Sequence, residues 1–93
     1  MAHIFIIDDS PTDVRVFTTL LEKAGHRVSS AVNAEEGISG VKRELPDLVI
    51  MDINLPGMGG VECTRQLVQA CPGVLVVMLT VYDNAEAIFA SLE

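Results

Sequence analysis

Acidic side chains follow two of the apolar segments in this sequence. Asp8 and Asp9 come directly after the run HIFII (3–7), and Asp52 ends the run DLVIMD (47–52). A carboxylate is costly to remove from water unless something pairs with it, so a partner is expected for these charges. Carboxylates brought together repel one another, and a divalent cation relieves that repulsion. All-oxygen ligands suit Mg²⁺ or Mn²⁺, which often bind phosphate oxygens as well.

The chemistry to expect is therefore phosphoryl chemistry. One carboxylate could be the nucleophile, since aspartate forms acyl-phosphate intermediates. Thr80, at the end of the run VLVVMLT (74–80), could hydrogen-bond a phosphoryl oxygen. Each residue also has a simpler interpretation: the acid pair as turn or capping residues, Asp52 as a solvent-facing strand end, and Thr80 as a β-former. Because Ser10 already supplies a helix cap, the acid pair is surplus to that need.

An alternation of strands and helices positions these residues. Apolar, β-branched runs predict strands at residues 3–7, 26–32, 47–52 and 74–80. Apolar periodicity and capping residues predict helices over residues 11–25, 33–45, 61–71 and 84–93. The order βαβαβαβα predicts a parallel sheet with helices on both faces and right-handed crossovers. The second strand is the most polar and is expected near an edge, whereas the third and fourth are expected to be buried.

The first two helices carry recognisable end and face signals. Ser10 is expected as the N-cap of the first helix, with Pro11 at its first position, Asp13 completing a capping box and Gly25 ending the helix. The apolar residues expected on its buried face are Val14, Phe17, Leu20 or Leu21, and Ala24. Those expected for the second helix are Ile38, Val41 and Leu45, while Gly37 and Gly40 lower its propensity.

Composition narrows the class of protein further. The 93 residues, 49% of them hydrophobic, fit one small domain with a packed core. The net charge of −7 argues against direct nucleic-acid binding and suits a site that gathers cations. Neither a signal peptide nor a membrane span is visible, so a cytoplasmic protein is expected. Cys63 and Cys71 are eight apart on one predicted helix, which is too far for a disulfide, and we interpret both as small buried hydrophobes.

The strands bring the polar residues to one place. In a parallel sheet all the carboxyl ends lie on the same edge, and ligands bind there where the winding direction reverses. If the first and third strands are neighbours, Asp8, Asp9 and Asp52 converge at that edge.

At this point the sequence resembles a known family. The stretches IIDDSP, DLVIMDINLPGMGG and VVMLT look like the receiver domain of bacterial two-component response regulators, in order and over the whole chain. The stretch MLTVYDNAEAIF resembles receivers attached to DNA-binding domains of the LuxR/NarL type. The resemblance implies a flavodoxin-like, doubly wound α/β fold with strand order 2-1-3-4.

The resemblance also implies roles for the acidic residues. Asp52 would be the phosphoacceptor, attacking the phosphorus of a phosphohistidine on a histidine kinase or phosphotransfer protein. Asp9 and Asp52 would hold Mg²⁺ through their side chains, and Asn54 would contribute its backbone carbonyl. Asp8 would act mostly through metal-bound water. The chain would then be a signalling switch controlling an output outside it, most simply transcription, rather than a dedicated enzyme.

The same resemblance implies further site residues, and it also points to a lysine of the family that has no counterpart among these residues. Thr80 would contact the phosphoryl group and report its presence, while Pro56 and Gly57 shape the loop beside the site. A complete receiver continues with a fifth strand carrying a lysine, then a fifth helix. The two lysines of this chain, Lys23 and Lys42, do not follow predicted strands. We therefore expect residues 1–93 to form a receiver that is incomplete at its C-terminus.

Two alternatives and a further partner remain open. A pseudo-receiver would serve as an interaction module without phosphorylation. A metal-dependent aspartyl-phosphate phosphatase of the haloacid dehalogenase type is disfavoured, because its nucleophile lies in a DxD motif and this chain has adjacent acids instead. Without a fifth strand, the fourth would be an open apolar edge, so the chain is expected to pair with a second copy or swap elements through its fourth strand and helix.

Overall fold

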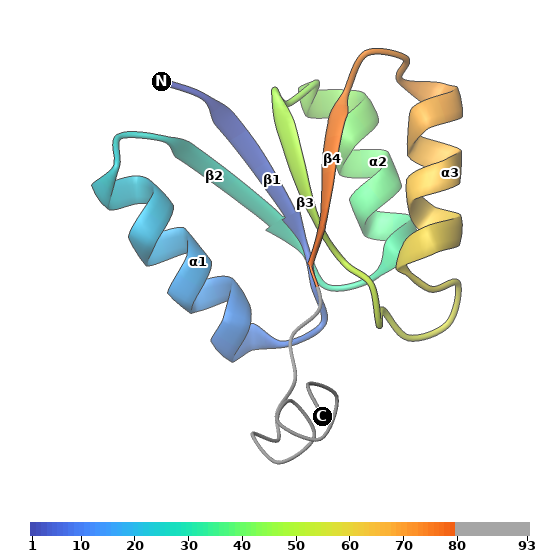
Figure 1. The fold of residues 1–93 in the computed structure, drawn as a ribbon, viewed down its shortest axis with the longest axis horizontal. Helices are drawn as coiled ribbons and strands as arrows, with labels where there is room; N and C mark the ends of the chain where they lie inside the picture. Colours follow the sequence, from blue (N-terminus) through green and yellow to red (C-terminus); the bar gives the residue numbers. More distant parts are fainter. Residues whose placement is uncertain (80–93) are drawn as a thin grey trace, which may run out of the picture.

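Strands and helices alternate along the chain in the computed structural model, which describes residues 1–79 (Figure 1). The strands are β1 (His3–Ile7), β2 (Arg27–Ala31), β3 (Leu48–Asp52) and β4 (Leu75–Leu79). The helices are α1 (Pro11–Lys23), α2 (Ala34–Glu44) and α3 (Gly60–Ala70). Within this part of the chain no helix is long and apolar enough to cross a membrane. The helix predicted over 84–93 lies outside the described residues.

The four strands form one parallel sheet in the order β2-β1-β3-β4. Helix α1 lies on one face of the sheet, and α2 and α3 lie side by side on the other (Figure 1). The predicted doubly wound parallel sheet and its strand order are thus confirmed, as is the edge position of β2. The winding direction reverses between β1 and β3, which are direct neighbours.

The main hydrophobic core lies between the sheet and the α2–α3 layer. Its buried members are Phe5, Ile7, Ala31, Ala34, Val41, Val49, Met51, Leu55, Cys63 and Leu67. Gly37 and Gly40, which the sequence analysis treats only as weak helix formers, face this core. A Cβ at Gly37 would lie 2.5 Å from Ile7 Cδ1, and one at Gly40 would collide with the Phe5 ring. The glycines therefore let α2 pack closely against β1.

Burial on the α1 side of the sheet is weaker than predicted. No α1 residue is fully buried: Val14, Phe17 and Leu21 are half-buried, and Leu20 is 60% exposed. The prediction that β4 is a buried strand is wrong for the described residues, since Leu75 is 66% exposed. The reason is positional, because α1 packs mainly on β2 and β4 is the last strand at the other end of the described sheet. Strand β3 is buried fully only on its α2–α3 face.

The C-terminal end of α2 differs from the expectation, whereas the N-terminal end of α1 agrees with it. Leu45 does not join the apolar face of α2 but caps the helix in the left-handed conformation (φ 49°) and is 72% exposed. Pro46 follows it, and a residue before proline avoids the helical region. At α1 the Ser10 cap and Pro11 at the helix start are confirmed, and the helix ends at Lys23, with Ala24 as its C-cap and Gly25 beyond it at a positive φ of 92°.

The two cysteines differ in their surroundings. Cys63 is completely buried, and burial raises the pKa of its thiol to about 11. Its thiol stays protonated at neutral pH and serves as a small core side chain. Cys71 was expected to be buried too, but it is only half-buried, because it caps α3 at its C-terminal end.

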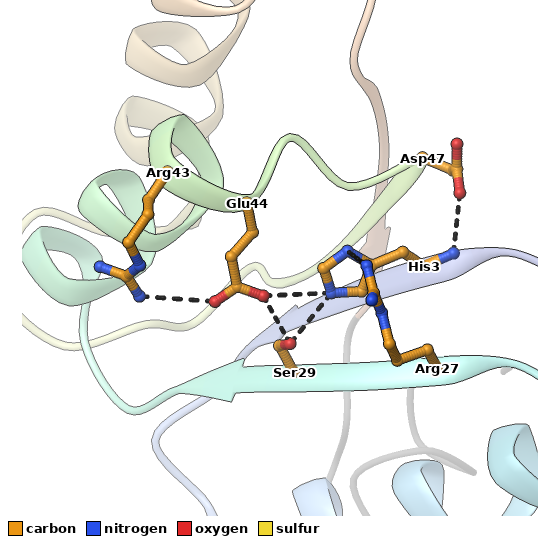
Figure 2. A network of polar contacts seen from close by, with 6 residues as sticks. All are labelled: His3, Arg27, Ser29, Arg43, Glu44 and Asp47. Atoms are coloured by element: carbon orange, nitrogen blue, oxygen red, sulfur yellow. Dashed lines mark hydrogen bonds and ion pairs between the residues drawn. The ribbon is translucent and has the colours of Figure 1, made fainter.

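A polar network joins β1, β2 and α2 at the amino edge of the sheet (Figure 2). His3 is only 8% exposed, and its Nε2 lies 3.0 Å from Ser29 Oγ and 3.1 Å from Glu44 Oε1. Arg27 approaches the other ring nitrogen at 3.0 Å, and the Asp47 carboxylate accepts the His3 backbone N–H at 2.7 Å. Ser29 and Glu44 both contact the same ring nitrogen of His3, whereas a nucleophilic triad needs them on opposite ring nitrogens. The network therefore holds β1, β2 and α2 together and has no catalytic geometry.

Candidate functional site

The carboxyl edge of the sheet gathers three carboxylates. Ile7 pairs with Met51 in the β1–β3 register, so the next residues, Asp8 and Asp52, leave the sheet side by side. Ligand oxygens of Asp8, Asp9 and Asp52 all lie within 4.8 Å of one another. The predicted convergence of these side chains is therefore present in the structure.

Asp8 is held firmly in place. It is 4% exposed, its backbone N–H donates to the carbonyl of Ala31 at 3.1 Å, and its Oδ1 accepts the N–H of Ser10 at 2.8 Å. Half of the predicted capping box is present, because the Asp13 N–H donates to Ser10 Oγ at 3.3 Å. The other half is wrong: Ser10 gives its N–H to Asp8 and not to Asp13. Asp8 is thus no surplus acid, since it also organises the start of α1.

Asp52 is positioned by the turn that follows β3. Its Oδ1 accepts the backbone N–H of Asn54 at 3.0 Å, which leaves Oδ2 for other partners. The next residue, Ile53, donates its N–H to the carbonyl of Leu79 at 3.0 Å and accepts from Gly60 at 3.3 Å. The turn is thereby tied both to β4 and to the first residue of α3.

Gly60 is a site-forming residue that the sequence analysis missed. A Cβ there would lie 2.7 Å from the Ile53 Cα and would collide with the Asp52 carbonyl oxygen. Only glycine lets α3 begin this close to the Asp52 backbone. Nothing in the GMGG sequence (57–60) distinguishes Gly60 from Gly59. Gly57 takes a positive φ of 80°, a conformation that glycine adopts readily.

Burial and mutual repulsion make the Asp8 and Asp52 carboxylates hold protons more tightly. Burial is the main cause that raises the pKa of Asp52. The hydrogen bond from the Asn54 N–H lowers this pKa, whereas a hydrogen bond with Asp9 and the negative charge of Asp9 raise it. Burial also raises the pKa of Asp8, against the lowering effect of the Ser10 N–H. A divalent cation would offset this crowding, and a donor set made only of oxygens fits Mg²⁺ or Mn²⁺.

The remaining predicted site residues have different outcomes. Thr80 lies outside the described residues. Lys23 and Lys42 lie in the last turns of α1 and α2, and crossover helices run antiparallel to the strands. Both lysines therefore lie at the end of the sheet opposite Asp52, which agrees with the expectation that neither follows a strand.

Comparisons with known proteins agree with this geometry. The family model for the response regulator receiver domain matches residues 4–93, so the chain belongs to that family, the signalling switches of two-component systems. PilH of Pseudomonas aeruginosa is 42% identical over 86 residues, which cover 90% of this chain and 71% of PilH. Protein-glutamate methylesterase relatives from Natronomonas pharaonis and Methanospirillum hungatei are covered over only 25–26% of their length.

Solved structures show the same fold. A CheY-like receiver domain from Methanospirillum hungatei has a TM-score of 0.83 at 32% identity, covering 99% of this chain and 74% of that one. A LuxR-family response regulator from Aurantimonas has a TM-score of 0.82 at 29% identity, covering 99% of this chain and 67% of that one. The family placement disfavours the haloacid dehalogenase-type alternative.

Proposed function

We propose that Asp52 accepts a phosphoryl group from a phosphohistidine of a sensor histidine kinase or phosphotransfer protein. The observation that carries the proposal is the convergence of three carboxylates within 4.8 Å at the carboxyl edge, one of them ending β3. Because Asp52 Oδ1 is engaged by the Asn54 N–H, Oδ2 is the oxygen expected to attack. Its bond to phosphorus forms as the P–N bond breaks. The electron pair leaves with the imidazole nitrogen, which takes up a proton.

The cation expected at this site is Mg²⁺, with Mn²⁺ as a substitute. Asp9 and Asp52 would hold it through their side chains, Asn54 through its carbonyl and Asp8 through water. When bound, the cation neutralises negative charge on the carboxylates and on the incoming phosphoryl oxygens. The chain's own contribution is to keep the carboxylates fixed, through the Ser10 N–H on Asp8 and the Asn54 N–H on Asp52.

Other features of the proposal concern the response to phosphorylation. Thr80 is expected to contact the phosphoryl group, and Pro56 and Gly57 to shape the adjoining loop. The output would be a change of partner or of transcription outside this chain. The LuxR-family neighbour supports an output of the DNA-binding kind.

The phosphoacceptor assignment can be tested with beryllofluoride, which mimics a phosphoryl group on aspartate. Fluorine NMR of the protein with Mg²⁺ and beryllofluoride should show a bound signal that Asp52→Asn abolishes and that Glu22→Gln, a change at the far end of α1, leaves unchanged. A bound signal of equal size in Asp52→Asn would contradict the assignment. The lack of a signal in the wild type would favour the pseudo-receiver alternative.

A further inference from the structure

Asp13 is an acidic residue beside the site for which the proposed function has no role. It lies in the first turn of α1 and is half-buried. The capping box would have given its carboxylate the Ser10 N–H, but that N–H donates to Asp8 at 2.8 Å. Within residues 1–79 no hydrogen bond or ion pair is found for the Asp13 carboxylate. The contact of Asp13 with Ser10 is made by its backbone N–H.

Two hydrogen bonds fix Asp13 relative to the carboxylate cluster. Asp8 accepts from Ser10, and Ser10 Oγ accepts from Asp13, so the first turn of α1 is linked to the edge of the sheet. Only Asp8, Asp9 and Ser10 separate the carboxyl end of β1 from the first turn of α1, so Asp13 lies at the same edge of the sheet as the cluster. It is not among the three acids whose oxygens lie within 4.8 Å. Asp13 therefore lies at the rim of the cluster.

We propose that Asp13 sets the charge selectivity of the site, strengthening divalent cation binding and slowing transfer from dianionic phosphodonors relative to monoanionic ones. The inference rests on the proposed function. Three carboxylates and one divalent cation leave a net charge of −1 at the cluster, and Asp13 makes it −2. A dianionic donor is repelled by that charge more strongly than a monoanionic donor.

A purely structural role is the competing interpretation. An acidic residue in the first turn of a helix interacts favourably with the helix dipole. In that case neutralising Asp13 would lower the thermal stability but leave cation affinity and donor preference unchanged. The two readouts therefore separate the interpretations.

The test compares Asp13→Asn with Glu22→Gln, which removes the same charge from the other end of α1. Calorimetric titration with Mg²⁺ should show affinity about two- to fivefold weaker for Asp13→Asn at low salt, because one negative charge at the rim of the site is removed. The rate with acetyl phosphate, relative to that with phosphoramidate, should rise about two- to fivefold. Both effects should shrink in high salt, and Glu22→Gln should match the wild type.

Charge-conserving and alternative variants keep the test decisive. Asp13→Glu should behave like the wild type, and Asp13→Ser replaces Asp13→Asn if circular dichroism shows that the latter does not fold. Unchanged Mg²⁺ affinity and donor preference in a folded neutral variant would overturn the inference. If the wild type takes up phosphoryl groups from neither donor, the proposed function fails, and the Mg²⁺ titration alone then decides the role of Asp13.

Discussion

Asp8 and Asp52 are the two carboxyl groups at the site whose pKa the fold raises. A raised pKa means that the folded state binds protons more tightly than the unfolded state. The resulting stabilisation is present at acidic pH and is lost as the pH rises through the raised pKa. Without a cation, the ionised cluster therefore destabilises the protein at neutral pH, and Mg²⁺ should reverse this by binding the folded state.

Replacing Asp52 by Asn should thus stabilise the metal-free protein at pH 7, by about 1 kcal/mol, the energy of two charges ~4 Å apart in water. Urea unfolding with a chelator present measures this, and Glu22→Gln is the control. Added Mg²⁺ should stabilise the wild type more than Asp52→Asn. A wild type that is more stable than Asp52→Asn in chelator would contradict this account of the cluster.

Ser29 and Glu44 make the shortest contact in the polar network of Figure 2. Ser29 Oγ donates to Glu44 Oε1 at 2.6 Å, and this bond is the main cause of the lowered pKa of Glu44. A lowered pKa stabilises the fold above the ordinary glutamate pKa, and the contribution is lost as the pH falls through the lowered value.

Ser29→Ala should therefore raise the pKa of Glu44 and lower the stability by about 1–3 kcal/mol, because the mutation removes a hydrogen bond to a charged group. NMR titration of the Glu44 carboxyl and urea unfolding measure the two effects. Ser30, the exposed neighbour of Ser29 on β2, gives the matched control. Equal effects of Ser29→Ala and Ser30→Ala would show that the network is not what shifts Glu44.

At the scale of elements, the start of α3 depends on Gly60. A side chain there must displace the Asp52–Ile53 backbone, and overpacking of this kind destabilises proteins by about 1–3 kcal/mol. Gly60→Ala should therefore lower stability despite the better helix propensity of alanine, and should weaken Mg²⁺ binding by moving Asp52. Gln69→Ala on the exposed side of α3 is the control. An unchanged Mg²⁺ affinity in a folded Gly60→Ala protein would show that α3 does not position Asp52.

The elements themselves were largely predictable, but their contacts were not. Strand periodicity and the Ser10 cap follow from local residue chemistry, and the structure confirms them. Gly40 and Gly60 look unfavourable or neutral in sequence. Their role is to leave room for a neighbouring element, and the sequence does not show which element lies against them. Leu45 fits an apolar helix face by spacing alone, whereas Pro46 ends the helix before it. The Asp8–Ser10 bond likewise competes with a local capping pattern that looks complete.

At the scale of the whole molecule, β4 carries exposed apolar residues at the end of the described sheet. Leu75 is 66% exposed and Val77 48%, and such surfaces favour pairing with another chain. We therefore expect concentration-dependent self-association in sedimentation velocity at tens of micromolar, which Val77→Lys should weaken. A Val61→Lys change on exposed α3 should leave it unaltered. A wild type that is monomeric over this range would contradict the expectation.

The three carboxylates could be located from the sequence because a parallel sheet sends every carboxyl end to one edge. That rule needs only the strand positions and the adjacency of β1 and β3, both of which the structure confirms. The apolar composition of β4 favours a buried strand, because this composition is the same whether or not a helix covers the strand. The exposure of Leu75 and Val77 agrees instead with the expectation of an open fourth strand. The role of Asp13 is equally hard to predict from the sequence. Its position suggests a capping residue, and its effect on the carboxylate cluster depends on how α1 is oriented.

The central claim, that Asp52 is the phosphoacceptor, is tested most directly by mapping the modified residue. The protein is incubated with Mg²⁺ and acetyl phosphate, the acyl phosphate is trapped by borohydride reduction, and its position is read by peptide mass spectrometry. We expect one trapped residue, Asp52, and no trapping without Mg²⁺ or in Asp52→Asn. Trapping at Asp8 or Asp9 in the wild type, or equal trapping in Asp52→Asn, would contradict the claim.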